Sequence, residues 1–167
     1  MAKTVAVFLA LGSNLGDRID HLNLARKELS GEVKIIKESG IYETPPWGFV
    51  DQPAFLNQVL SAETSLSAHD LLVFVKNIEK QMGRVETFRN GPRVIDIDIL
   101  LYGDLEIQTS DLTIPHPRML ERGFVLVPLA EIAPQLIVPG QTLTVTDHLN
   151  KVDQKGIRKL ETGEIGK

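Results

Sequence analysis

The order of apolar and polar residues predicts alternating strands and helices up to about residue 101. Residues Thr4–Leu11 are apolar at most positions, as in a strand buried on both faces. Ser67-Ala68-His69-Asp70 resembles a capping box, and apolar residues follow it at helical spacing until Gly83. The predicted order is strand, helix, strand, strand, helix, strand, over residues 4–11, 18–29, 33–43, 54–64, 67–82 and 94–101.

This order predicts an α+β fold with a ferredoxin-like split β-α-β core, in which both helices pack on one face of an antiparallel sheet. Later residues predict short elements only: a strand at 106–109, helices at 118–122 and 124–132, an edge strand at 136–138 and a helical turn at 144–150. The length of 167 residues suits one domain. We expect that domain to occupy residues 1–150, and we expect residues 151–167, which contain no aromatic residue, to form a mobile C-terminal tail.

Composition and charge exclude several classes of site. The chain has no cysteine, which excludes disulfides, thiol nucleophiles and cysteine-ligated metals and fits a reducing, cytoplasmic location. A net charge of -4 argues against a broad nucleic-acid-binding surface, because affinity for phosphate backbones needs clustered positive charge. The opening apolar run is too short to span a membrane. No feature of the sequence indicates an obligate protein partner.

Two carboxylates interrupt the most strand-like run in the chain. Side chains alternate along a strand, so Asp96 and Asp98 point to one face while Ile95, Ile97 and Ile99 point to the other. Two like charges roughly 6 to 7 Å apart raise each other's proton affinity unless a cation lies between them. Oxygen ligands without cysteine or clustered histidine favour Mg²⁺ over zinc. The pair therefore predicts either a magnesium site or a half-exposed strand whose polar face is acidic.

Basic residues near the two aspartates favour an anionic ligand. Arg84, Arg89 and Arg93 lie directly upstream, and His116 and Arg122 lie downstream. Neither of the common glycine-rich phosphate motifs is present. Residues 12–16, Gly-Ser-Asn-Leu-Gly, could cradle a phosphate, but a turn with a structural role fits them better. The alternatives from the residues alone are a metal-dependent nucleotidyltransferase or glycosyltransferase and a non-catalytic ligand-binding module.

The segment Arg89-Asn90-Gly91-Pro92-Arg93-Val94-Ile95-Asp96-Ile97-Asp98-Ile99-Leu100 resembles the signature of the 6-hydroxymethyl-7,8-dihydropterin pyrophosphokinase family. These enzymes move the terminal diphosphate of ATP onto a pterin alcohol. Further blocks resemble the family in the same order, at residues 10–16, 42–48, 51–57, 83–84, 115–117 and 122–124.

The resemblance implies two Mg²⁺ ions held by Asp96 and Asp98, and ATP as co-substrate. It implies catalytic roles for these aspartates together with Arg84 and Arg93. The residues implied to bind the nucleotide are Glu79, Arg89, Arg93, Ile99, Thr113, His116 and Arg122.

For the pterin, the resemblance implies a ring held between Phe55 and Phe124, with Asn57 at its polar edge. Further pterin contacts are implied for Thr44, Pro45, Pro46, Gly48 and Asp96. Three positions depart from the family pattern. Glu86 stands where a basic loop residue is expected, and Pro117 stands where His116 could have a hydroxyl-bearing neighbour. Asn90 stands where some relatives have a large aromatic residue, for which Phe88 or Trp47 could substitute.

Overall fold

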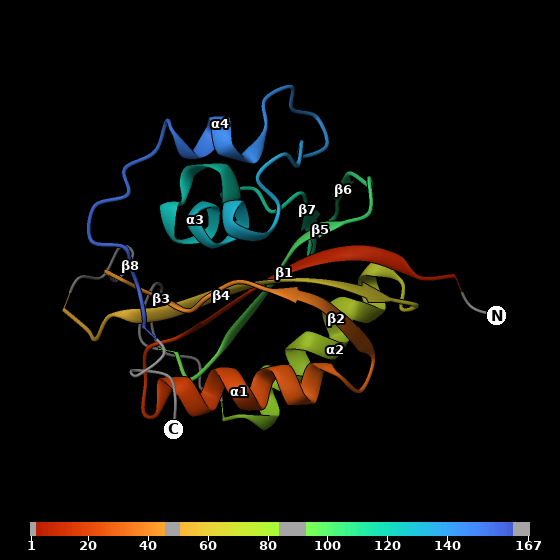
Figure 1. The fold of residues 1–167 in the computed structure, drawn as a ribbon. Coiled ribbons are helices and arrows are strands. Elements are labelled where there is room, and N and C mark those ends of the chain that lie inside the picture. Colours follow the sequence, from red (N-terminus) through yellow and green to blue (C-terminus); the bar gives the residue numbers. More distant parts are fainter. Residues whose placement is uncertain (1–2, 46–50, 84–92, 162–167) are drawn as a thin grey trace.

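The computed structural model describes residues 3–45, 51–83 and 93–161, and Figure 1 gives its fold. The elements in these residues are β1 Val5–Ser13, α1 Arg18–Leu29, β2 Val33–Glu38, β3 Tyr42–Thr44, β4 Phe55–Thr64, α2 Ala68–Gln81, β5 Asp96–Tyr102, β6 Ile107–Gln108, β7 Thr113–Ile114, the 3-10 turn η1 Met119–Glu121, α3 Gly123–Ile132, α4 Val145–Leu149 and β8 Arg158–Lys159.

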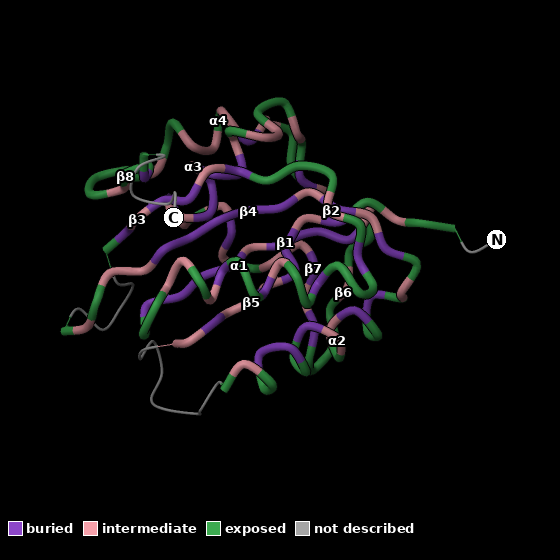
Figure 2. Tube along the Cα trace, turned by 60° about the horizontal axis from the view of Figure 1, so that its bottom comes forward, coloured by how far each residue is buried: buried purple, intermediate pink, exposed green. Residues whose placement is uncertain are grey.

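Among the described residues, six strands form one antiparallel sheet in the order β5-β1-β4-β3-β8, and β2 pairs with β4 beside β3. The middle of the sheet is the long pairing of β1 with β4, from Val5 opposite Thr64 to Ser13 opposite Leu56. Figure 2 shows β4 buried along most of its length. The order of β1, α1, β2, β4, α2 and β5 confirms the predicted split β-α-β core.

Helices cover both faces of the sheet (Figure 1). On one face α1 and α2 pack through Leu22, Leu29, Leu71 and Val75 against alternate residues of β1 and β5, which confirms that both predicted helices share a face. Ser67 caps α2 by accepting the Asp70 backbone N–H.

The opposite face carries α3 and α4, and their core includes Leu126, Leu129 and Val145 packed with Val59 and Leu100 of the sheet. None of the helices in the described ranges is long and apolar enough to cross a membrane.

The predicted strand at 33–43 is divided in two by a bulge. Ser39, Gly40 and Ile41 oppose only two residues of β4, because Glu38 pairs with Leu60 and Tyr42 with Asn57. The Ser39 hydroxyl accepts the Val59 backbone N–H at 2.9 Å, in place of the carbonyl that a regular ladder would supply. The continuous strand was therefore the wrong prediction at this position.

Two further segments differ from the sequence prediction. Residues 136–138, predicted as an edge strand, lie between α3 and α4 as an irregular segment, where Val138 is buried in the core of those helices and the Leu136 carbonyl accepts the Val145 N–H. Residues 151–161 were predicted as part of a mobile tail. Instead β8 pairs with β3, and Leu160 is buried in the core under the sheet.

Candidate active site

A cavity opens on the α3 face of the sheet, where β1, β3, β4 and β5 approach the start of α3. The described residues enclose about 180 Å³. This volume is smaller than the roughly 300–1,000 Å³ that is usual for ligand pockets, and it counts only the space between the described residues. Its walls are Ala10, Leu11, Gly12, Thr44, Pro45, Phe55, Asn57, Gln58, Arg93, Asp96, Asp98, Arg122, Phe124 and Val125.

Asp96 and Asp98 both line this cavity, while Ile97 and Ile99 between and after them are buried in the core on the other face. The alternation predicted from the sequence is therefore confirmed. The Arg93 guanidinium lies 3.7 Å from Asp96, so one of the two negative charges has a positive neighbour within the chain.

His116 and Arg122 are within electrostatic reach of Asp98. Burial lowers the pKa of His116, and the negative charge of Asp98 partly opposes that effect. Burial also lowers the pKa of Arg122, again opposed by Asp98. Asp98 therefore opposes the effect of burial on both bases, and the Arg122 guanidinium, which lines the cavity, makes its surroundings attractive to an anion.

The donor set at Asp96 and Asp98 suits one kind of metal site. Within the part of the chain that the structure describes, no group of three or more His, Asp or Glu side chains gathers as a ligand set. A closed structural zinc site needs four protein ligands, so it does not fit. Mg²⁺ commonly takes one or two carboxylates and fills its other positions with water and phosphate oxygens, which fits a pair of aspartates facing a cavity.

The other end of the cavity combines aromatic rings with a buried amide. Phe55 at the start of β4 and Phe124 in the first turn of α3 both line it, and the Arg122 guanidinium lies 5.4 Å from the centre of the Phe124 ring. The Asn57 amide donates a 2.6 Å hydrogen bond to the Thr44 hydroxyl, and both residues are buried. This bond fixes the orientation of Asn57, which leaves its carbonyl oxygen for a partner in the cavity.

Other predicted residues lie elsewhere. Ile99, Thr113 and His116 are not among the residues that line the cavity, and their contacts with the nucleotide stay predictions. Ile99 is a core residue, Thr113 lies in β7, and His116 donates its backbone N–H to the Leu100 carbonyl. Arg84, Arg89, Pro46 and Gly48 lie outside the described residues, as do Glu86 and Asn90, so their roles stay predictions.

Glu79 lies beneath the aspartate pair, on the α2 side of the sheet. Its carboxylate accepts the backbone N–H of Ile97 at 2.7 Å, between the two aspartates, and its side chain is 2% exposed. The resemblance implies a nucleotide contact for Glu79, which stays a prediction, and the alternative of a solvated helical residue is wrong because the side chain is buried. Besides the backbone of β5, the carboxylate lies 3.4 Å from the Lys76 ammonium.

Asn14 is a site residue that the sequence did not identify. It is buried, its amide donates to the Gln52 side chain and to the Pro53 carbonyl, and its oxygen accepts the Arg93 backbone N–H at 2.7 Å. It therefore joins the turn after β1 to the approaches of β4 and β5, which agrees with a structural role for residues 12–16. Its partners are 38 to 79 positions away, so no local pattern could reveal them.

Comparison with known proteins agrees with this architecture. The model of a family described as 7,8-dihydro-6-hydroxymethylpterin-pyrophosphokinase (HPPK) matches residues 8–134. A protein of Methylorubrum extorquens named 2-amino-4-hydroxy-6-hydroxymethyldihydropteridine pyrophosphokinase is 44% identical over 156 residues, which is 92% of this chain and 98% of that protein.

Some relatives are much longer. The folic acid synthesis protein FOL1 of Dictyostelium discoideum is 50% identical over 147 residues, but this chain spans only 22% of its length. The solved structure of wild-type Plasmodium falciparum HPPK-DHPS with pterin and p-hydroxybenzoate superimposes with a TM-score of 0.73 at 19% identity, over 89% of this chain and 42% of that one. At that identity the likeness shows a shared fold. On the family match and the full-length relative, the chain is a diphosphokinase that belongs to the 7,8-dihydro-6-hydroxymethylpterin-pyrophosphokinase family.

Proposed function

We propose that this enzyme transfers the β,γ-diphosphate of ATP to the hydroxymethyl group of 6-hydroxymethyl-7,8-dihydropterin, giving the pterin diphosphate ester and AMP for folate biosynthesis. The observation that carries the proposal is one cavity that holds Asp96 and Asp98 together with Phe124 and Asn57. Such a cavity combines groups for a metal-bound polyphosphate with groups for a flat polar ring. Two relatives are named as pyrophosphokinases of 2-amino-4-hydroxy-6-hydroxymethyldihydropteridine, which supports the same pterin substrate.

The phosphate end of the cavity would be formed by acidic and basic residues together. Two magnesium ions held by Asp96 and Asp98 would neutralise phosphate charge when bound. Arg93 and Arg122 line the same cavity, and a planar guanidinium can donate to two phosphate oxygens at once. Arg84 and Arg89 would add to this group from the segment between α2 and β5.

The pterin end would hold the ring between Phe55 and Phe124. Asn57, oriented by Thr44, would pair with the polar edge of the ring, and the backbone at Pro45 would close that side. A rigid ring held in this way would keep its hydroxymethyl group in one orientation toward the nucleotide, and such positioning can supply a large part of the rate.

In the proposed reaction the hydroxymethyl oxygen attacks the β-phosphorus of ATP. A bond from this oxygen to the β-phosphorus forms while the bond to the oxygen shared with the α-phosphate breaks, so AMP leaves with that oxygen and the hydroxyl proton is lost. The side chains act by positioning and charge, and none forms a covalent intermediate. The absence of cysteine supports a cytoplasmic site for this chemistry. A relative that this chain covers to 98% of its length supports a reaction without an obligate protein partner.

Product analysis tests the proposal. The protein is mixed with Mg-ATP and the reduced pterin alcohol, and mass spectrometry follows the products. We expect the pterin diphosphate ester and AMP in equal amounts. Release of pyrophosphate with a nucleotide attached to the pterin would instead identify a nucleotidyltransferase, and binding of both ligands without any product would identify a non-catalytic module.

A further inference from the structure

The last described residues cross the molecule beside the proposed pterin end of the cavity. Residues 151–160, here the C-terminal strap, run from the end of α4 to β8, which pairs with β3 at the edge of the sheet (Figure 1). The match to the family model ends at residue 134, so the strap lies outside it. The strap nevertheless touches two of the elements that wall the cavity.

The first contact is with the start of α3. A Cβ atom on Gly123 would lie 2.8 Å from the carbonyl oxygen of Asp153 and 2.9 Å from the Cδ1 atom of Ile157. Only a residue without a side chain permits so close an approach. Gly123 lies between Arg122 and Phe124, both of which line the cavity, so the strap contacts the backbone that carries them.

The second contact is with Pro45, the residue after β3. A Cβ atom on Gly156 would lie 2.8 Å from Cγ of the Pro45 ring, and Gly156 has a φ of +83°, a conformation that favours glycine. Pro45 also lines the cavity, directly after Thr44. One short segment of the strap, residues 153–157, therefore contacts both the Pro45 side and the Phe124 side.

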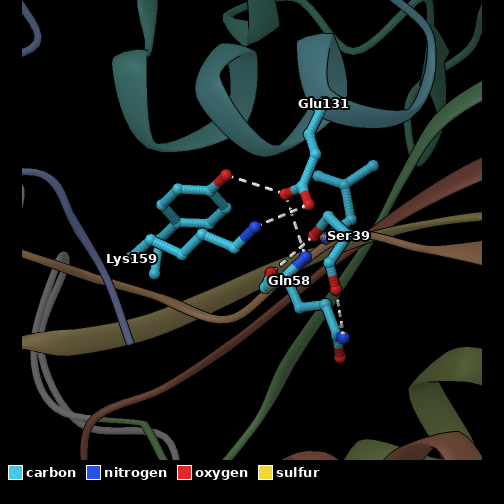
Figure 3. Close-up of polar contacts among 7 residues, drawn as sticks. Ser39, Gln58, Glu131 and Lys159 are labelled. Carbon is cyan, nitrogen blue, oxygen red and sulfur yellow. Dashed lines mark hydrogen bonds and ion pairs between the residues drawn. The ribbon is translucent and has the colours of Figure 1, made fainter. Parts of the chain in front are cut away.

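The strap is anchored by a polar cluster on α3 (Figure 3). The Lys159 ammonium lies 2.9 Å from the Glu131 carboxylate, which also accepts hydrogen bonds from the Tyr42 hydroxyl at 2.7 Å and from the Gly40 backbone N–H at 3.0 Å. The Leu160 N–H donates to the Ile41 carbonyl, and the Leu160 side chain is buried. The strap is thus fixed to α3, β3 and the core together.

We propose that the C-terminal strap is a positioning element that sets the positions of Pro45 and Phe124 relative to one another, and through them the affinity for the flat ring bound at this end of the cavity. The proposal rests on the function proposed above for this end of the cavity. Ile157 is the main positioning residue, because its side chain packs on Gly123 and its backbone follows Gly156. It acts through the walls of the cavity, which it does not itself line.

The test is a set of variants at Ile157, assayed for each substrate separately. Ile157→Ala removes the contact with Gly123, and Ile157→Val keeps most of it. Ile137→Ala makes the same substitution at a side chain that is 50% exposed, as a matched control. For each variant, steady-state kinetics give KM for the reduced pterin alcohol and for Mg-ATP, and calorimetry gives the pterin Kd in the presence of a non-hydrolysable ATP analogue.

For Ile157→Ala we expect the pterin KM and Kd to rise on the order of five- to tenfold, while the ATP KM stays within about twofold. Ile157→Val and Ile137→Ala should both resemble the wild type. Unchanged pterin affinity in a folded Ile157→Ala protein, or an equal rise in both KM values, would overturn the proposal. If Ile157→Ala does not fold, Lys159→Met, which loosens the same anchor, decides by the same criteria.

The wild-type protein separates this proposal from the proposed function. A wild type that binds no pterin would count against the function itself. A wild type that is active, with an Ile157→Ala variant that binds the pterin equally well, would count against the strap alone.

Discussion

Replacing Tyr42 with phenylalanine should measure how strongly the Glu131 cluster holds α3 to the sheet. The change removes one hydroxyl and leaves the ring, so packing is kept. In the wild type this hydroxyl donates a 2.7 Å hydrogen bond to the Glu131 carboxylate (Figure 3). Glu131 keeps its contacts with Gly40 and Lys159, so no buried charge is left without a partner.

The magnitude follows from the exposure of the two partners. A hydrogen bond to a charged acceptor contributes roughly 1.5 to 3 kcal/mol when it is well shielded. Tyr42 is 8% exposed, but the Glu131 side chain is 31% exposed, which places the value near the lower end. We therefore expect Tyr42→Phe to lower the free energy of unfolding by about 1 to 2 kcal/mol, which is roughly 2 to 8 °C in Tm for a chain of this size.

The pH dependence gives the prediction a second measurable part. Burial tends to raise the pKa of Glu131, but the hydrogen bonds from Tyr42, Lys159 and Gly40 outweigh it and lower that pKa. A carboxylate with a lowered folded pKa contributes stability above its unfolded pKa of about 4.3, and that stability is lost as the pH falls through the folded value. Burial and the bond to Glu131 raise the pKa of Tyr42, so this group adds no pH dependence below about pH 9.

Urea unfolding at pH 7 and at successive pH values below 5 checks both parts. Tyr102→Phe is the matched control, because the Tyr102 hydroxyl is also buried but donates to the neutral carbonyl of Leu66. The decrease in the free energy of unfolding caused by Tyr42→Phe should become smaller as the pH falls below 4, and the decrease caused by Tyr102→Phe should stay the same. A Tyr42→Phe cost below about 0.5 kcal/mol at pH 7, or equal pH profiles for the two variants, would refute the reasoning.

Three further variants test the cavity. Asp98→Asn should lower kcat on the order of 10² to 10³-fold at saturating Mg²⁺ without loss of stability. Asp104→Asn, an exposed control after β5, should leave kcat unchanged. Near-wild-type turnover of Asp98→Asn would remove the role proposed for Asp98. Asn57→Ala should raise the pterin KM more than the ATP KM, and the reverse order would contradict the placement of the ring. Asn14→Ala leaves the Arg93 backbone N–H without its buried acceptor, so we expect the free energy of unfolding measured in urea to fall by about 2 to 3 kcal/mol. An unchanged midpoint of the urea transition would exclude a structural role for Asn14.

The elements that the sequence predicted well are those whose pattern is local. The cap at Ser67 and the apolar spacing after it located α2, and alternation along β5 placed Asp96 and Asp98 on one face. The order of these elements was enough to predict the sheet and the face that α1 and α2 cover. Period and capping depend on neighbouring residues, so one sequence contains that information.

The features that the sequence missed depend on distant partners. Ser39 breaks the strand because its hydroxyl reaches β4, and Lys159 belongs to a strand because Glu131 and β3 lie beside it. From its sequence neighbours Asn14 is predicted as a turn residue, and its contact with Arg93 is seen only in the folded structure. The roles assigned to Arg84 and Arg89 remain predictions from the family signature.

The pairing of β1 has a consequence for the growing chain. Both neighbours of β1 follow it in the sequence, since β4 ends at Thr64 and β5 at Tyr102. During synthesis β1 therefore has no hydrogen-bonding partner among the described strands until residues 55–64 emerge, and one of its edges stays open until residues 96–102 follow. Before β4 and α2 emerge, α1 is the described helix that can cover the apolar residues of β1, so the nascent chain passes through an interval in which this strand is available to chaperones or to other nascent chains.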